Sequence, residues 1–220
     1  MLPAFLLSLI IQLYVNSRYT KWRQVLNRSG LNGVQVAKQL SAHTGMYGLS
    51  LKGTPGHMTD HYDPRDNTLY LSQGSAQSSS VAAIAITAHE MGHAQQDQEE
   101  YFPMRMRSAM VPVVNIGTSV GWIFILLGLL LEISGIAWLG VIAFSAGAIF
   151  AIATLPVELN ASKRARKMLQ SSGIVTSQDE LKGVKQTLNA AALTYVAAIA
   201  TSVMQLLYFT SLIGGGRRRS

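Results

Sequence analysis

The chain has 220 residues, of which 49% are hydrophobic and only 13% are charged, and its mean hydropathy is +0.24. Soluble domains carry about 25% charged residues, so the composition argues against an ordinary soluble domain. The net charge is +7, but the basic residues cluster beside apolar runs, and we expect no nucleic-acid partner. The absence of cysteine excludes disulfides, thiolate metal ligands and a cysteine nucleophile.

The chain begins with an apolar run at residues 1–17, "MLPAFLLSLIIQLYVNS". A secretory signal peptide is the alternative for this run, but such peptides have a basic stretch before the apolar core and a small-residue cleavage site after it. This run has neither feature, and the basic sequence "RYTKWR" follows it at once. We therefore expect residues 1–17 to form an uncleaved transmembrane anchor.

Short elements are expected in the polar region that follows, residues 18–108. Residues 29–46, "SGLNGVQVAKQLSAHTGM", predict a short helix with one apolar face. The segments "YGLSLKG" (residues 47–53) and "NTLYLS" (residues 67–72) are strand candidates, and the turn-rich "TPGHMTDHYDPRD" (residues 54–66) separates them. Because "TLYLS" precedes the next helix directly, we interpret it as an edge strand that pairs with the backbone of a substrate.

The next helix is predicted over "VAAIAITAHEMGHAQQ", with an N-cap from the serines at positions 78–80. His89 and His93 are four residues apart and lie on one face of this helix, where both imidazoles reach one ion about 2.0–2.1 Å away. Glu90 is rotated by about 100° from His89 and is placed to accept the proton of an attacking water. This H-E-x-x-H arrangement indicates a zinc hydrolase, with Zn²⁺ as its cofactor.

Three further runs contain no charged residue, at positions 109–131, 136–155 and 188–213. At a rise of about 1.5 Å per residue each run spans a hydrocarbon core of about 30 Å, so each predicts a transmembrane helix. The first two runs are joined by "EISG" alone. Residues 109–155 therefore predict an antiparallel hairpin, and the chain after it returns to the side of the membrane on which residue 108 lies.

The basic residues predict the orientation in the membrane. Residues 18–108 carry nine lysines and arginines and residues 156–187 carry six, which places both segments in the cytoplasm. The tail at 214–220, "GGGRRRS", conflicts with this orientation if all four helices cross. Either the last helix does not cross the membrane or the tail is non-native sequence. Within residues 156–187, "SKRARK" is the basic flank of a span, and the alternative is that Arg164 or Arg166 binds a substrate carboxylate.

A catalytic zinc ion needs a third protein ligand besides the two histidines. Asp97 is one further turn along the helix, too far from the ion, and fits a role as a supporting partner of the ligands. Glu158 is brought to the correct side by the hairpin and lies on a separate helix. The alternative is that Glu158 is a glutamate at the membrane border that extends into water and binds no metal. The candidates for this ligand are His43, His57, His61, Asp97 and Glu158.

Four segments of the chain form a recognisable series: "LSLIIQLYVNSRYTKW", "TDHYDPRDNTLYLS", "TAHEMGHAQQ" and "LPVELNASKRARKML". In order and spacing, over nearly the whole chain, they resemble the YugP-like family of bacterial membrane zinc metallopeptidases. The layout is also similar to the gluzincin membrane proteases, including the CAAX prenyl proteases and heat-shock membrane proteases. The resemblance implies a gluzincin-type peptidase with Glu158 as the third ligand. Ser162 stands where those relatives carry an aspartate, which implies a supporting role for Ser162.

Four other residues are candidates for substrate or oxyanion contacts. His57, His61 and Arg65 lie in the turn-rich segment, where the alternative is an ordered surface turn. Tyr195 lies in the last apolar run, where the alternative is packing.

Together these observations predict a mainly α integral membrane protein of the bacterial cell membrane. About four transmembrane helices accompany a small cytoplasmic α+β zincin-like peptidase region. The expected function is hydrolysis of peptides or membrane-protein segments by a zinc-activated water, with Glu90 as the general base. The alternative is a catalytically silent zinc-binding scaffold or chaperone-like binder. A transporter is disfavoured, because the predicted spans contain no acid or base.

Overall fold

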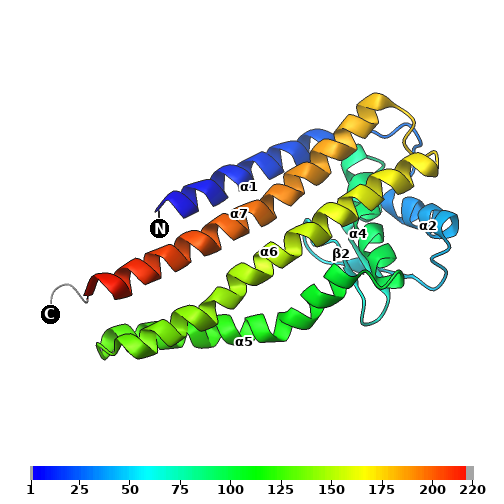
Figure 1. The fold of residues 1–220 in the computed structure, drawn as a ribbon. Coiled ribbons are helices and arrows are strands. Elements are labelled where there is room, and N and C mark those ends of the chain that lie inside the picture. Colours follow the sequence, from blue (N-terminus) through cyan, green and yellow to red (C-terminus); the bar gives the residue numbers. More distant parts are fainter. Residues whose placement is uncertain (1, 217–220) are drawn as a thin grey trace. The chain divides into compact units, whose positions relative to one another are not determined.

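The computed structural model describes residues 2–216, and Figure 1 shows the chain from blue to red along the sequence. It contains seven helices and a three-stranded sheet within these residues. The helices are α1 (Leu2–Arg23), α2 (Gly33–Thr44), α3 (Gln73–Ala76), α4 (Val81–Gln98), α5 (Phe102–Leu130), α6 (Ser134–Ser171) and α7 (Gln178–Gly216). The strands are β1 (Ser50–Thr54), β2 (His61–Asp63) and β3 (Thr68–Ser72). The expectation of a mainly helical protein with a small sheet is confirmed.

The chain divides into two compact units. The first unit comprises Met1–Gln12, Arg105–Pro156 and Thr194–Ser220, and the second comprises Leu13–Met104 and Val157–Leu193. Helices α1, α5, α6 and α7 each contribute residues to both units. We describe each unit by itself.

The first unit holds the apolar parts of the long helices. Within residues 2–216, α5, α6 and α7 are the three helices long and apolar enough to cross a membrane, which agrees with three of the predicted spans. Helices α5 and α6 pack closely where small residues face each other, because a Cβ on Gly140 would lie 2.7 Å from the carbonyl oxygen of Gly121. Close packing through small residues is typical of membrane helices. The short connection between α5 and α6 agrees with the predicted hairpin.

The predicted N-terminal anchor corresponds to α1, whose hydroxyl at Ser8 lies 3.2 Å from that of Thr201 on α7 in the first unit. That α1 forms a fourth span remains a prediction. Of the basic tail, residues 217–220 lie outside the described part of the chain.

The sheet of the second unit has the strand order β1-β3-β2. Strand β1 is parallel to β3, with Leu51 beside Leu69, and β2 is antiparallel to β3, with Tyr62 beside Leu69. Both predicted strands are therefore present. The proposed edge position of "TLYLS" is wrong, because β3 is the central strand. The edge beside α4 is β2, which lies inside the segment that we expected to be a turn, since three residues next to a proline carry too little strand pattern.

Helix α4 lies at the centre of the core of the second unit. Its N-cap is Ser80, whose hydroxyl accepts the backbone N–H of Ala83 at 3.2 Å, as the serine pattern predicts. Its apolar residues are almost fully buried, including Ile84 and Met91. They pack with the apolar face of α2 and with residues of α6 and α7, such as Leu169 and Val184. A buried helix with few polar groups is a rigid base for side chains that must hold a fixed geometry.

Candidate metal centre

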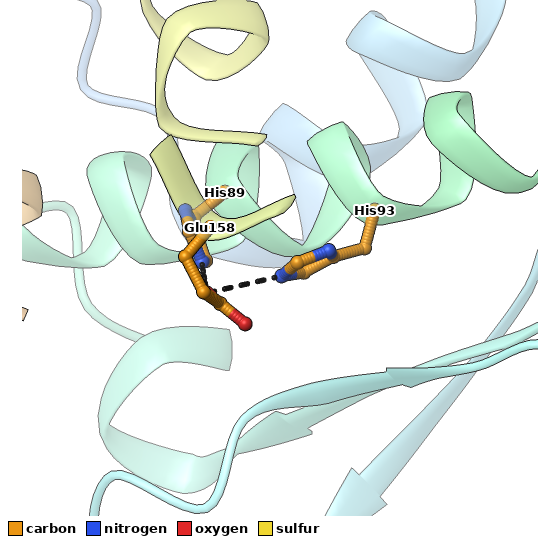
Figure 2. A group of neighbouring side chains, drawn as sticks. All are labelled: His89, His93 and Glu158. Carbon is orange, nitrogen blue, oxygen red and sulfur yellow. Dashed lines mark hydrogen bonds and ion pairs between the residues drawn. The ribbon is translucent and has the colours of Figure 1, made fainter. Parts of the chain in front are cut away.

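The helices α4 and α6 bring three potential metal ligands together. His89 and His93 lie one turn apart on α4, and Glu158 projects toward them from α6 (Figure 2). The Glu158 Oε2 atom lies 3.2 Å from Nε2 of His89 and 3.5 Å from Nε2 of His93. Two ligands bound tetrahedrally to one ion at about 2.0–2.1 Å lie about 3.3 Å apart. The positions of the three side chains therefore fit a zinc ion.

Two of the three residues, His93 and Glu158, are buried, and His89 is partly buried. Glu158 is 4% exposed and His93 is 9% exposed, and a buried carboxylate needs a compensating positive charge. Within residues 2–216 these three residues form the group of histidine and acidic side chains that could hold a metal ion, with ligand atoms within 4.8 Å of one another. The positions of His43, His57, His61 and Asp97 lie outside this group.

The close contact between α4 and α6 depends on Gly92, which lies inside the "HEMGH" sequence. A Cβ atom at this position would lie 2.5 Å from the carbonyl oxygen of Ala161 and 3.1 Å from its Cα. Ala161 and Ala165, on the same part of α6, are fully buried. Small residues on both helices therefore allow Glu158 to reach the histidines.

The outer ring nitrogens of both histidines have hydrogen-bonding partners. Nδ1 of His89 lies 3.2 Å from the hydroxyl of Ser162, and Nδ1 of His93 lies 3.0 Å from Oε1 of Gln96. When Nδ1 carries the proton and donates it to such a partner, Nε2 presents its lone pair to a metal. Ser162 therefore contacts His89, which is consistent with its predicted supporting role, although the role itself stays a prediction.

Gln96 is a functional candidate that the sequence analysis missed. It is fully buried, and its amide donates to the carbonyl oxygen of Val157 at 2.8 Å and to Oδ1 of Asn160 at 3.0 Å. Gln96 thus joins His93 on α4 to the segment of α6 that carries Glu158. The signal in the sequence was a polar residue three positions after His93, on the same face of a helix expected to be buried.

Glu90 lies next to this group and points toward β2. Its Oε2 atom accepts the backbone N–H of Tyr62 at 3.1 Å. Burial raises the pKa of Glu90 above its usual 4.5, against the opposing effect of the two histidines. A carboxylate whose pKa is shifted toward neutral pH is a more effective proton acceptor.

The pKa of His93 reflects the same cluster of charges. Burial lowers this pKa, but the hydrogen bond with Glu158 and the negative charges of Glu90 and Glu158 together raise it above 6.5. In the absence of a metal the two carboxylates thus favour the protonated form of His93. A divalent cation takes the place of that proton when it binds.

Asp97 has a different partner from the one expected. Its Oδ2 atom accepts the hydroxyl of Tyr62 at 2.8 Å, and the same hydroxyl lies 3.0 Å from Oδ1 of Asn67. Burial and the hydrogen bond to Asp97 raise the pKa of Tyr62 above 10.0, so this hydroxyl stays protonated. Asp97 therefore fixes the side chain of Tyr62, whose backbone contacts Glu90, and this is an indirect link to the site.

The other predicted contact residues have local partners. The His57 ring packs edge-on against Tyr19, and the His61 ring stacks on Tyr70 with 4.7 Å between centroids. Arg65 forms an ion pair with Asp63 at 2.6 Å. The predicted contacts of these three residues with a substrate or oxyanion stay predictions. Tyr195 belongs to the first unit, and its role also stays a prediction.

A helix that carries two histidines and a glutamate, with a second buried glutamate from another helix, is the ligand arrangement of gluzincin-type zinc hydrolases. The family model described as "Putative neutral zinc metallopeptidase" matches residues 1–214, and the chain belongs to this family. The chain is also similar to the "Putative membrane protease YugP" of Bacillus subtilis (strain 168). The two are 39% identical over 211 residues, which cover 96% of this chain and 93% of that relative. No solved structure matches the chain.

Proposed function

We propose that the protein is a membrane-embedded zinc metallopeptidase. His89, His93 and Glu158 would hold the ion, and the spacing of their ligand atoms is the observation that carries the proposal. Membership of the family and the likeness to a membrane protease support peptide hydrolysis as the reaction. The donor set of two imidazoles and one carboxylate suits zinc and leaves one tetrahedral position for water or substrate.

In this mechanism the residues around the ion have separate roles in hydrolysis. Zinc, when bound, would act as a Lewis acid that acidifies water and polarises the peptide carbonyl. Glu90 accepts a proton from the attacking water and passes it to the leaving amine. The N–H of Tyr62 holds the Glu90 carboxylate in place before the reaction. Ser162 and Gln96 keep the two imidazoles in the orientation that ligation needs.

An extended peptide would lie along the outer edge of β2. Tyr62 pairs with β3 on one side of this strand, while its N–H points to Glu90 on the other. An edge strand offers backbone groups to an added strand, which aligns a peptide without regard to most of its side chains. We therefore infer that the substrates are extended peptides or unfolded segments of membrane proteins.

We place the site on the cytoplasmic side of the bacterial cell membrane. Residues 18–108 and 156–187 carry fifteen of the 18 lysines and arginines, and basic residues near spans favour the cytoplasm. Both segments contribute to the second unit, which contains the candidate metal centre.

Glu90→Gln tests the mechanism, because the amide keeps the shape of the side chain but cannot accept the proton. We expect the full-length variant to retain zinc and to lose cleavage of a quenched fluorescent peptide by about 10²-fold or more. Zinc is quantified by plasma mass spectrometry on the same sample. Cleavage that survives this change would refute Glu90 as the base. A wild type that binds zinc and cleaves no peptide would favour the silent scaffold.

Glu158→Ala tests the ligand set separately. We expect the zinc content to fall sharply, because two imidazoles alone hold the ion weakly. Retention of zinc at the wild-type level would show that the third ligand is another residue, with His57 and His61 as the next candidates.

A further inference from the structure

A large basic groove lies in the second unit, and none of the three candidate metal ligands lines it. Its volume is about 770 Å³. Helix α6 contributes one wall and helix α7 the other. The lining residues are Lys163, Arg166, Lys167, Gln170, Ser171, Leu181 and Lys185. The five residues from α6 follow the i, i+3, i+4, i+7, i+8 spacing of a single helix face.

The lining of this groove contains four cations and no acidic residue. Lys163, Arg166 and Lys167 are three or four positions apart on α6, where like charges repel and destabilise the helix. The charge of Lys167 helps to lower the pKa of Glu99, so this acid is within electrostatic reach of the face. Its carboxylate is bound to Arg164 at 2.7 Å. Within residues 2–216, the groove therefore has a surplus of positive charge that no carboxylate in its lining offsets.

The donors in the groove are suited to phosphate oxygens. The Arg166 Nε atom donates to the carbonyl oxygen of Ser162 at 3.4 Å, which anchors the guanidinium and leaves its terminal nitrogens for a ligand. Lysine ammonium groups and arginine terminal nitrogens are the usual partners of phosphate. Gln170 adds an uncharged hydrogen-bonding group at one end of the row, while the hydroxyl of Ser171 already lies 2.9 Å from Nε2 of His43. The combination favours an anion with several oxygens.

We propose that this groove binds a phosphate-bearing anion. Its volume falls within the range of about 300–1,000 Å³ that is typical of small-molecule sites, so it can hold a group larger than a lone phosphate. The headgroup of an acidic phospholipid and free inorganic phosphate share the required chemistry. Both walls of the groove belong to helices that are candidate membrane spans, and anionic lipids attract basic residues next to such spans.

The test compares two double variants of the full-length protein in neutral detergent micelles. Lys163→Gln/Lys167→Gln removes two charges from the groove. Lys38→Gln/Lys182→Gln removes two charges from exposed lysines that do not line it, and is the matched control. Binding of short-chain phosphatidylglycerol, short-chain phosphatidylcholine and inorganic phosphate is measured by isothermal titration calorimetry. Unchanged circular dichroism and zinc content show that each variant is folded.

We expect the wild type to bind phosphatidylglycerol more tightly than phosphatidylcholine. The groove variant should bind phosphatidylglycerol at least tenfold more weakly than the wild type. The affinity of the control variant for phosphatidylglycerol should stay within twofold of the wild type. Binding of phosphatidylglycerol without binding of inorganic phosphate identifies a lipid headgroup as the ligand. Equal binding of inorganic phosphate identifies the free anion. Failure of both anions to bind the wild type, or equal weakening in the two double variants, would overturn the proposal.

Discussion

Gly92→Ala tests whether the metal centre depends on the close approach of α4 and α6. The added methyl group would lie 2.5 Å from the carbonyl oxygen of Ala161, while real Cβ contacts stay beyond 3.0 Å. The two backbones must therefore separate by at least the difference of 0.5 Å. The clash is between a Cβ atom, whose position the α4 backbone fixes, and backbone atoms of α6, so no side-chain rotation relieves it.

The separation acts directly on the ligand geometry. Ala161 lies one turn after Glu158 on α6, so a movement of this turn moves the carboxylate away from both imidazoles. Ligand distances in zinc sites vary by only about 0.2 Å, and the required movement exceeds this. We expect zinc affinity to fall by about 10- to 100-fold, the size of effect found when groups that orient ligands are changed. Overpacking costs about 1–3 kcal/mol, and the better helix propensity of alanine offsets about 1 kcal/mol of that cost.

Zinc affinity is therefore the informative measurement, and it is obtained by competition with a chromophoric chelator. Gly214→Ala is the control, because this glycine lies on α7 with no atom within 4 Å of the added Cβ. We expect the control to bind zinc like the wild type and to have an equal or slightly higher Tm. Wild-type zinc affinity in Gly92→Ala would refute the reasoning that this glycine sets the ligand geometry.

Two further predictions concern the surroundings of His93. Gln96→Leu keeps the volume of the side chain but removes the partner of the outer ring nitrogen, and we expect zinc affinity to fall by about 10- to 100-fold in the same chelator competition. An unchanged affinity would show that Gln96 serves packing alone. Because Glu158 and Glu90 raise the pKa of His93 above 6.5, protons compete with zinc below that pKa, and zinc affinity should decrease as the pH falls from 8 to 6. A zinc affinity independent of pH over this range would contradict that reasoning.

The periodicity of the sequence was sufficient to predict the helix and the common face of the two candidate histidine ligands. His89 and His93 share a face because of their spacing alone, and Ser80 marks the start of the helix. Connectivity predicted only that Glu158 returns to the correct side, since a short loop joins two long apolar runs, and the family resemblance implied that it is the third ligand. These features depend on local geometry or on length, and both are visible in a single sequence.

Contacts between segments far apart in the chain could not be predicted in the same way. The backbone N–H of Tyr62 reaches Glu90 because β2 folds against α4, and a backbone group carries no sequence signal. The start of α7 gives a second example, because "SQDE" (residues 177–180) has the S-x-x-E pattern of a capping box, yet Glu180 does not close it. Ser177 does accept the N–H of Asp179 at 3.3 Å, but the carboxylate of Glu180 accepts the N–H of Arg28 at 2.6 Å. Tertiary structure provided a partner that the local pattern did not indicate.

The basic segment "SKRARK" shows how one stretch of α6 takes part in three environments. Ser162 contacts His89, while Arg164 pairs with Glu99 and packs over the ring of Tyr101. Lys163, Arg166 and Lys167 line the basic groove. A helix turns by about 100° per residue, so neighbouring residues of the segment face different surroundings. The interpretation of the whole segment as a basic membrane flank therefore does not distinguish these three environments. Because Glu158 and the groove residues share one rigid helix, substitutions confined to the groove face should leave zinc binding unchanged, which makes zinc content a valid folding control for the groove variants.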